Sequence, residues 1–378
     1  MKINSNTMQL DKSLPTIDDL KELLLNNINL LDVRAPIEFS DGALPTAKNI
    51  PILNDKERSE VGKIYKNEGH EAALAHGLKI IKGQKRERKI KEWKSFLTKN
   101  NEGAIYCYRG GLRSQITQQW LKETTGKVFP RVSGGYKSIR NFLIENLDIN
   151  SINVKPIIIG GRTGVGKTLF IKSINPNIDL EDLAFHRGSA FGSHSMPQPT
   201  QVDFENRLSL AILKTVSQKK NFCLVEDESS NIGKRHIPKS FFNVMNKSPI
   251  LVLQATTEER IKITKDEYVK NSLQEYQDML GEGAGFDMWS KGLKDSLLKV
   301  RKRLGGVNYK IVEDLLIKAI DLHSKNGETY LHEKWIKELL LKYYDAMYKY
   351  QLEKKKERII LKGTKKDLQL FLKENYMD

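Results

Sequence analysis

The chain has 378 residues, of which 39% are hydrophobic and 29% charged, so it has enough apolar material for two or three globular domains. Its net charge of +16 favours a polyanionic partner, nucleic acid first and an anionic membrane surface second, although a general lysine bias would give the same excess. Two cysteines and scattered histidines exclude a disulfide framework and lead us to expect no structural metal.

The N-terminus lacks the apolar core of a signal peptide, and no apolar run approaches the length of a membrane span. We therefore expect a cytoplasmic protein that has no membrane partner and whose thiols stay reduced.

The first 150 residues alternate short apolar runs with helical patterns, which is typical of a parallel α/β sheet. Thr16 is the expected N-cap of the first helix, which runs to Leu25. A polar, irregular stretch at 148–155 indicates a boundary, so residues 1–150 are assigned to a first domain. The expected strands cover 29–34, 103–106 and 128–132. The later helical patterns cover 57–66, 71–81 and 85–97, and two more helices follow the segments 108–114 and 133–136 and run to about residues 123 and 147.

Cys107 follows the apolar run 103–106 and precedes a loop that leads into a helix. Loop N–H groups, a helix N-terminus and nearby arginines stabilise a thiolate, which can act as a nucleophile or carry a transferred sulfur or selenium atom. The alternative is a buried structural cysteine, which is our interpretation of Cys223. Cys107 is assigned as catalytic, and its active-site loop contains Arg109, Gly110, Gly111, Arg113 and Ser114.

A second glycine-rich loop follows the apolar run 156–159. Residues 161–168 fit the pattern GxxxxGK(S/T) between an expected strand and an expected helix, which is typical of a P-loop. Glycines let successive N–H groups point at phosphate oxygens, while Lys167 reaches a terminal phosphate and Thr168 holds a divalent ion. An incidental glycine turn is the alternative. The predicted phosphate-binding residues are Gly161, Gly164, Gly166, Lys167 and Thr168.

Two further apolar strands, at 222–228 and 250–253, make residues 151–265 an α/β domain. The first ends in an acidic cluster in which Glu226 and Asp227 are expected to order Mg²⁺, although a solvated acidic turn is the alternative. A segment containing His186, Arg187 and Gly188 is interpreted as either a substrate loop or a tight loop.

The remaining residues, 266–378, form a mostly helical C-terminal region, expected to pack on the P-loop domain and to close with a strand at 358–361 and a helix at 365–375. Its tyrosine-rich helix near 335–356 is expected to contribute to a core more than to contact RNA, because Tyr344 and Tyr348 share one helix face. The basic segment 82–94 suits either a nucleic-acid backbone or a solvated helix face.

Several segments together resemble known proteins. Residues 32–39, 107–114 and 134–136 resemble a rhodanese domain, in which a cysteine loop carries sulfur as a persulfide. A rhodanese domain followed by a P-loop domain is similar to the tRNA 2-selenouridine synthase family. The segments that extend this resemblance along the chain are 71–77, 186–192, 224–229 and 344–351. Tyr108 departs from it, because a small residue is expected there.

The resemblance implies a transferase that converts 2-thiouridine at the tRNA wobble position to 2-selenouridine. A geranyl group from geranyl diphosphate first alkylates the sulfur, and selenium from selenophosphate then displaces the S-geranyl group. It also implies that Cys107 serves selenation and that Gly77 belongs to a geranylation or substrate site.

The co-substrates would be selenophosphate and geranyl diphosphate. No tightly bound cofactor is expected, and Mg²⁺ is the candidate ion. The partners would be tRNA, small-molecule phosphates and a selenophosphate-producing enzyme, while the sequence leaves the oligomeric state open. Our hypothesis is that the P-loop grips the diphosphate of the prenyl donor. The rival hypotheses are a P-loop NTPase or small-molecule kinase with an accessory sulfur-carrier rhodanese domain, and a tRNA-binding or sulfur-carrier module without enzymatic activity.

Overall fold

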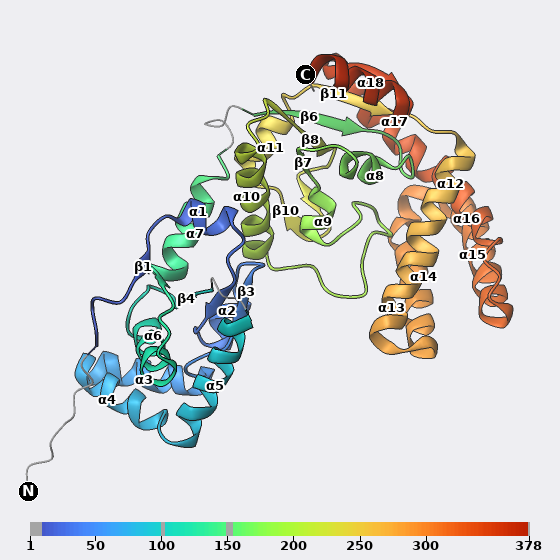
Figure 1. Cartoon of the computed structure of the whole chain (residues 1–378). Coiled ribbons are helices and arrows are strands. Elements are labelled where there is room, and N and C mark those ends of the chain that lie inside the picture. The colour runs from blue at the N-terminus through green and yellow to red at the C-terminus, as the bar shows by residue number, and fades with distance from the viewer. Residues whose placement is uncertain (1–9, 100–102, 149–153, 377–378) are drawn as a thin grey trace, which may run out of the picture. The chain divides into compact units, whose positions relative to one another are not determined.

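The computed structural model describes residues 10–99, 103–148 and 154–376, and the chain divides into two compact units (Figure 1). Unit 1 comprises Met1–Leu147 with Thr200–Lys214, and unit 2 comprises Asp148–Pro199 with Thr215–Asp378. Each unit contains a five-stranded parallel sheet, which confirms the predicted α/β class. None of the helices within these described ranges is long and apolar enough to cross a membrane.

The sheet of unit 1 has the strand order β1-β5-β4-β2-β3. Its strands are β1 (Thr16–Ile17), β2 (Leu30–Asp32), β3 (Ala47–Asn49), β4 (Ala104–Tyr106) and β5 (Arg131–Val132). The helices of its continuous segment are α1 (Leu20–Leu25), α2 (Pro36–Ser40), α3 (Asp55–Glu68), α4 (His70–Ile80), α5 (Gln84–Lys99), α6 (Leu112–Thr125) and α7 (Gly135–Glu145).

Helices cover both faces of this sheet. Neighbouring residues of a strand point to opposite faces, so each strand can contribute to two cores. Leu31 packs in one core with Trp93 of α5 and Trp120 of α6. Leu30 belongs to the opposite core, together with Leu143 of α7 and Leu213 of α10 (Gln201–Ser217). Most of α10 therefore belongs to unit 1, whereas the sequence analysis had placed all of 151–265 in the second domain.

The start of unit 1 differs from the expected helix. Thr16 is not an N-cap, because Thr16 and Ile17 form β1 and pair in parallel with β5. Helix α1 begins at Leu20, and the Asp19 carboxylate caps it by accepting a 2.8 Å hydrogen bond from the Glu22 amide. Thr16 and Ile17 are both β-branched, which favours an extended strand. Asp19 precedes the Glu22 amide by three residues, which is the spacing that an N-cap needs.

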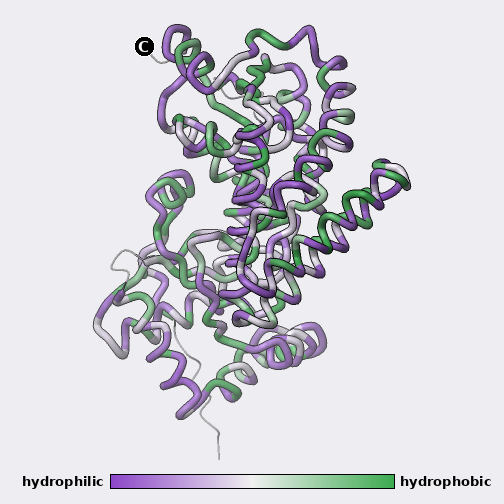
Figure 2. Tube along the Cα trace, turned by 90° about the vertical axis from the view of Figure 1, so that its right-hand side faces the viewer, coloured by the Kyte–Doolittle hydropathy of each residue, from purple (hydrophilic) through white to green (hydrophobic). Residues whose placement is uncertain are grey.

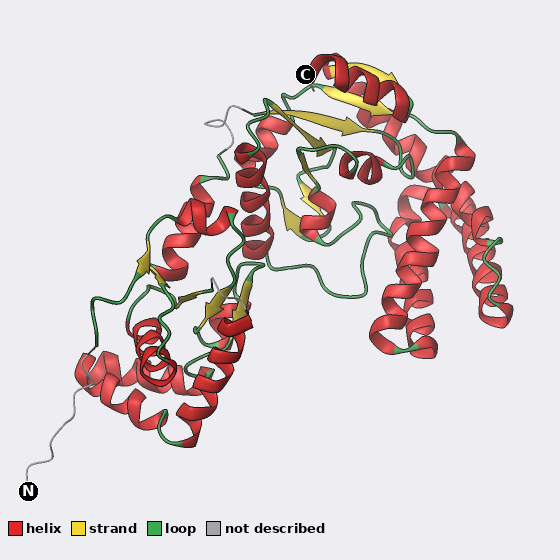
Figure 3. Ribbon diagram, in the orientation of Figure 1, coloured by secondary structure: helices red, strands yellow, loops and turns green. Residues whose placement is uncertain are grey.

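The sheet of unit 2 has the order β12-β11-β6-β8-β7. Figure 3 draws the strands in yellow and the helices in red. Its strands are β6 (Lys155–Gly160), β7 (Asn177–Ile178), β8 (Phe222–Glu226), β11 (Ile250–Leu253) and β12 (Ile359–Gly363), and a separate antiparallel pair is formed by β9 (Asn231–Ile232) and β10 (Arg235–His236). The helices that accompany these strands are α8 (Lys167–Lys172), α9 (Leu180–Ala184), α11 (Lys239–Met245), α12 (Thr257–Lys265) and α18 (Lys365–Tyr376).

The expected C-terminal region is not a separate unit, because β12 joins the sheet beside β11 and α18 packs on its core. Its other elements are η2 (Asp266–Asn271), α13 (Ser272–Leu280), α14 (Glu282–Leu304), α15 (Gly306–Asn326), α16 (His332–Leu339), η3 (Leu340–Tyr344), α17 (Asp345–Lys354) and η4 (Lys356–Arg358). Tyr344 is buried in their shared core with Trp289 and Trp335, as expected, whereas Tyr348, four residues later, is only half-buried and lines a cavity instead. Hydrophobic and hydrophilic residues interleave along the helices, as amphipathic packing requires (Figure 2).

Candidate active site

Cys107 lies in unit 1, between the end of β4 and the start of α6. Its Sγ atom is 3.2 Å from Ser114 Oγ and 3.8 Å from the Gly111 carbonyl oxygen, to which Ser114 Oγ donates at 2.9 Å. The cysteine is 3% exposed, but the space beside Gly111 is open. The loop therefore holds the thiol almost fully buried, in contact with Ser114 Oγ and near the Gly111 carbonyl.

A second segment fixes the shape of this loop. The Tyr136 amide donates to the Cys107 carbonyl at 2.9 Å. Gly135 has a φ of +60°, and a Cβ there would lie 2.2 Å from the Cys107 carbonyl oxygen. Gly110 has a φ of +64°, and a Cβ there would lie 2.9 Å from the Gly134 backbone nitrogen. Only glycine permits this close approach of the two backbones.

The two arginines of the loop differ in environment. Arg113 donates to the Glu38 carboxylate at 3.1 Å, and although burial opposes its charge, the hydrogen bonds and charge of Glu38 raise its pKa. Arg109 is exposed and forms no ion pair with the described residues. Arg113 therefore stabilises the loop, while Arg109 is the cation available to an anionic substrate.

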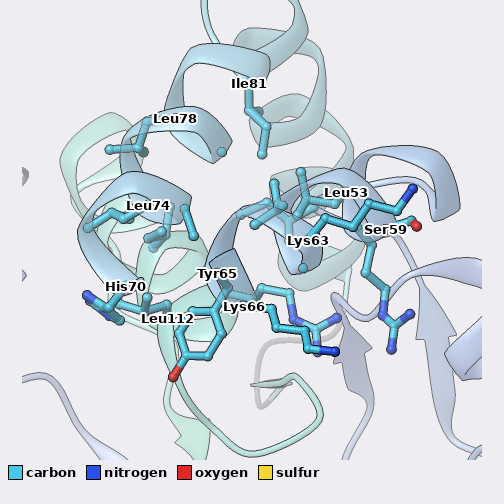
Figure 4. Close-up of a pocket in the computed structure, with 18 of the residues that line it drawn as sticks. Leu53, Ser59, Lys63, Tyr65, Lys66, His70, Leu74, Leu78, Ile81 and Leu112 are labelled. Atoms are coloured by element: carbon cyan, nitrogen blue, oxygen red, sulfur yellow. The ribbon is translucent and has the colours of Figure 1, made fainter. Parts of the chain in front are cut away.

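An apolar cavity of about 620 Å³ lies beside the helix that begins at this loop (Figure 4). Leu112 and Ile116 of α6 form one wall, and Leu74, Gly77 and Leu78 of α4 form another. Its polar lining residues are Arg58, Ser59, Lys63, Tyr65, Lys66, His70 and Arg113. The predicted substrate residue Gly77 is thus part of a cavity wall, and α6 connects that cavity to the cysteine loop.

The P-loop lies in unit 2, between β6 and α8. Gly164 and Gly166 have φ values of +82° and +83°, which glycine adopts readily. A Cβ at Gly164 would lie 2.5 Å from Thr264 Oγ1, so α12 packs closely on the loop. Lys167 Nζ donates to the Gly161 carbonyl at 3.2 Å, within the loop that it is expected to serve.

Carboxylates from the end of strand β8 and from helix α9 converge on Thr168. Its hydroxyl donates to Glu226 at 2.8 Å and is 3.1 Å from a Glu181 oxygen. Glu226 ends β8, which pairs with the P-loop strand β6, and Glu181 follows β7. Asp227 instead forms a 2.6 Å ion pair with Lys355. The structure therefore brings Glu226 to Thr168, whereas Asp227 is paired with Lys355.

The electrostatics of this acidic cluster fit a divalent cation. The pKa values of Glu226 and Glu228 are both raised well above the usual value. Burial is the main cause, and the charge of Glu181 is the second. Burial also raises the pKa of Glu181 to about 7. A cation relieves such repulsion, and Mg²⁺ commonly takes one or two carboxylates with phosphate and water as its other ligands. Thr168 and Glu226 would hold the ion, which would neutralise charge on a bound diphosphate.

The segment after α9 borders the same site. Gly188 has a φ of +60°, and a Cβ there would lie 2.2 Å from a Glu181 oxygen and 2.7 Å from a Glu228 oxygen. Its neighbour Arg187 lines the same pocket but forms its ion pair with Glu275. His186 lines a different cavity, which is described below. Of the three predicted loop residues, Gly188 is therefore the one that contacts the acidic cluster.

A cavity of about 880 Å³ continues from the P-loop. Lys167 and Gly188 lie on one side of it, and its aromatic wall contains Phe242, Tyr343, Tyr344 and Tyr348. The Tyr348 hydroxyl is buried and has no hydrogen-bond partner among the described residues. The P-loop therefore opens into a space with both polar and aromatic walls.

Comparisons with known proteins cover nearly all of the chain. The family model of the tRNA 2-selenouridine synthase AAA domain matches residues 154–378, and that of the rhodanese-like domain matches residues 16–142. A tRNA 2-selenouridine synthase from Sulfurovum sp. (strain NBC37-1) is 40% identical over 363 residues, which are 96% of this chain and 99% of that relative. The chain belongs to the tRNA 2-selenouridine synthase family.

Other members of this family are similarly related. The synthase from Shewanella sediminis (strain HAW-EB3) is 42% identical over 94% of this chain and 96% of its own length. That from Shewanella oneidensis is 44% identical over 89% of each chain. Among solved structures, the N-terminal domain of a putative ATP/GTP binding protein from Clostridium difficile 630 matches 34% of this chain and 98% of its own, at 32% identity and a TM-score of 0.30. The predicted resemblance to tRNA 2-selenouridine synthases, which are enzymes, is confirmed.

Membership of the tRNA 2-selenouridine synthase family does not by itself identify Glu181 or Lys355, which the sequence analysis missed. Glu181 follows β7, which is only two residues long and has no apolar run to mark it as a strand. Its position between the expected P-loop helix and the loop that contains His186 was the available signal. Lys355 is 128 residues from its partner Asp227, so no local pattern connects them.

Proposed function

We propose that this chain converts 2-thiouridine at the tRNA wobble position to 2-selenouridine in two transfers. In the first, the thiocarbonyl sulfur attacks C1 of geranyl diphosphate, the C1–O bond breaks with its electron pair leaving on diphosphate, and the N3 proton is lost. In the second, selenium of selenophosphate adds at C2 and the C2–S bond breaks, releasing geranylthiolate. Water then cleaves the P–Se bond to give phosphate and the selenated base.

The observation that carries this proposal is the shared use of α6 by the cysteine loop and the apolar cavity. Ser114 of α6 contacts the Cys107 thiol, and Leu112 and Ile116 of the same helix line the cavity. Its 620 Å³ lies within the roughly 300–1,000 Å³ of ligand pockets, and its apolar wall suits a ten-carbon chain. The S-geranyl group would occupy this cavity beside Gly77 while Cys107 serves the selenium transfer.

The first transfer is assigned to unit 2. Lys167 and the P-loop amides would bind the diphosphate of the prenyl donor, with Thr168 and Glu226 holding Mg²⁺ against its charge. The adjoining tyrosines support this assignment, because aromatic faces attract a cation and an allylic carbon becomes positive as diphosphate departs. Diphosphate binding for group transfer thus uses the same loop that an NTPase would use for its nucleotide.

The test is incubation of the purified chain with a 2-thiouridine-containing tRNA, geranyl diphosphate, Mg²⁺ and selenophosphate, followed by nucleoside mass spectrometry. We expect S-geranyl-2-thiouridine when selenophosphate is omitted and 2-selenouridine when it is present. The absence of both products would overturn the proposal, and ATP or GTP hydrolysis without tRNA modification would favour the NTPase alternative.

Variants separate the two transfers. Lys167→Ala should weaken geranyl diphosphate binding and abolish both products. Cys107→Ser should retain geranylation and lose selenation, because the change removes only the thiol of the second site. Cys223 is the matched control, since it is buried within β8 and burial raises its pKa to about 12, so Cys223→Ser should retain both transfers.

A further inference from the structure

Another cavity in unit 2, of about 560 Å³, shares no lining residue with the P-loop pocket or with the cavity that continues from it. His186 lines it, whereas the next two residues, Arg187 and Gly188, line the P-loop site. The other side chains that characterise this cavity are His194, Gln198, Lys234, Arg235 and Lys299. None of them belongs to the reaction steps assigned above.

The wall of this cavity has a single sign of charge. Lys234, Arg235 and Lys299 line it, and no carboxylate does. Within the described part of the chain these three cations form no ion pair, in contrast to Arg187 and His194, which both pair with Glu275. Unpaired cations that share a concave surface repel one another, so an anion that enters the cavity gains their attraction.

The cavity is also built with a defined shape. The Gln198 side chain donates to the carbonyls of Ala184 and Ile232 at 2.8 and 3.0 Å and accepts a 2.6 Å hydrogen bond from the Lys234 amide. Gly233, between β9 and β10, has a φ of +58°, and a Cβ there would lie 2.3 Å from Gln198 Oε1. Gln198 thus ties the cationic turn to the segment after α9, so the basic residues are held on one wall.

Two side chains of this wall each contain a nitrogen atom without a hydrogen-bond partner. His186 Nδ1 and Arg235 Nε are both buried, and neither has a partner among the described residues. Burial, with added repulsion from His194, Arg187 and Lys299, lowers the pKa of His186 to about 4. A phosphate oxygen would supply an acceptor and offset this repulsion, and the hydroxyls of Ser193 and Ser195 in the same wall are further donors.

We propose that this cavity binds a phosphate group, which the sugar–phosphate backbone of the tRNA supplies. The RNA source rests on the proposed function, since free phosphate donors carry the same chemistry. Cations that contact phosphates fix the position and orientation of an RNA, but they do not read its base sequence. The cavity therefore orients tRNA on unit 2 and leaves recognition of the thiolated base to the catalytic sites.

The test compares tRNA binding by the full chain at several KCl concentrations, measured by fluorescence anisotropy. The cavity variant is Lys234→Ala/Arg235→Ala/Lys299→Ala, and its control, Lys365→Ala/Lys366→Ala/Lys373→Ala, removes three exposed charges from α18. We expect the cavity variant to bind at least tenfold more weakly, with a salt slope reduced by about 0.7–0.9 for each phosphate that the variant no longer neutralises. The control should change affinity less than twofold.

Two further measurements make each outcome decisive. Lys234→Ala/Lys299→Ala removes only exposed side chains and repeats the test if the triple variant does not fold. Calorimetric titration with inorganic phosphate needs no tRNA. If the cavity variant loses affinity for inorganic phosphate but not for tRNA, the natural ligand of the cavity is a free phosphate compound and not the tRNA backbone. Equal behaviour of cavity and control variants toward both ligands would overturn the inference. If the unmodified chain binds no tRNA, the proposed function fails, and the phosphate titration still decides the cavity.

Discussion

Arg260 and Asp345 form a two-point ion pair that joins α12 to the start of α17, with nitrogen–oxygen distances of 3.0 and 2.6 Å. The same guanidinium donates through Nε to the Thr163 carbonyl at 3.0 Å, inside the P-loop. Arg260 is 1% exposed, so this pair is shielded from water. The C-terminal helical region thus positions the phosphate-binding loop as well as forming its own core.

Breaking this pair should destabilise unit 2. Asp345→Ala leaves the Arg260 charge buried without its carboxylate, which typically costs about 3–5 kcal/mol. We expect urea-induced unfolding to show this loss and geranyl diphosphate to bind more weakly. Arg162 also contacts Asp345, at 3.3 Å, but is 56% exposed, so Arg162→Ala should cost under about 1 kcal/mol. Equal losses in the two variants would contradict the bracing role of Arg260.

Gly188→Ala should disrupt the acidic cluster at the P-loop. The new Cβ would meet Glu181 and Glu228 oxygens, and the φ of +60° adds backbone strain of about 1–3 kcal/mol. Gly281→Ala is the matched control, because Gly281 has a φ of +84° with no atom near its would-be Cβ. Both variants should lose stability, whereas only Gly188→Ala should weaken Mg²⁺-dependent geranyl diphosphate binding. Unchanged binding would separate Gly188 from the site.

Gly77→Leu should fill the cavity beside α6. A Cβ at Gly77 has ordinary contact with Val61 at 3.8 Å, so Gly77→Ala should be tolerated, while the longer leucine extends into the cavity. Because this cavity is proposed to hold the S-geranyl group during selenium transfer, Gly77→Leu should accumulate S-geranyl-2-thiouridine and form less 2-selenouridine. Nucleoside mass spectrometry measures both products. Normal selenation by a folded Gly77→Leu variant would exclude this use of the cavity.

His332 should make the stability of the chain sensitive to acid. It is fully buried, its Nδ1 accepts a 2.9 Å hydrogen bond from Trp335, and burial lowers its pKa to about 3. The unfolded chain then binds the proton more readily, so this contribution is present above pH 6.5 and is lost as the pH falls toward 3, by up to about 1.4 kcal/mol per pH unit.

Urea unfolding between pH 7 and pH 4 measures this effect. His332→Asn should be less stable at pH 7, because it disturbs the core around Trp335, but its stability should fall less steeply with acid. His76→Asn is the control, since that histidine lies near the surface and contacts Glu60. An unchanged slope in His332→Asn would show that the buried imidazole does not contribute to acid sensitivity.

Features that depend on neighbouring residues could be predicted from local sequence patterns. The apolar runs of β6, β8 and β11 are continuous because both faces of a parallel sheet are buried. The glycine and lysine spacing of the P-loop, and the position of Cys107 after its strand, are also local patterns. They were sufficient for the fold class, both loops and the family resemblance.

The tertiary structure alone decided which distant residues complete these sites. Glu181 reaches Thr168 because β7 lies beside β8, and α10 joins unit 1 because its apolar side completes the core on that sheet. Asp227 turns to Lys355, and His186 faces a cationic wall formed partly by Lys299. Contacts between residues so far apart in the chain depend on how whole elements pack, and the spacing of residues within one element does not encode them.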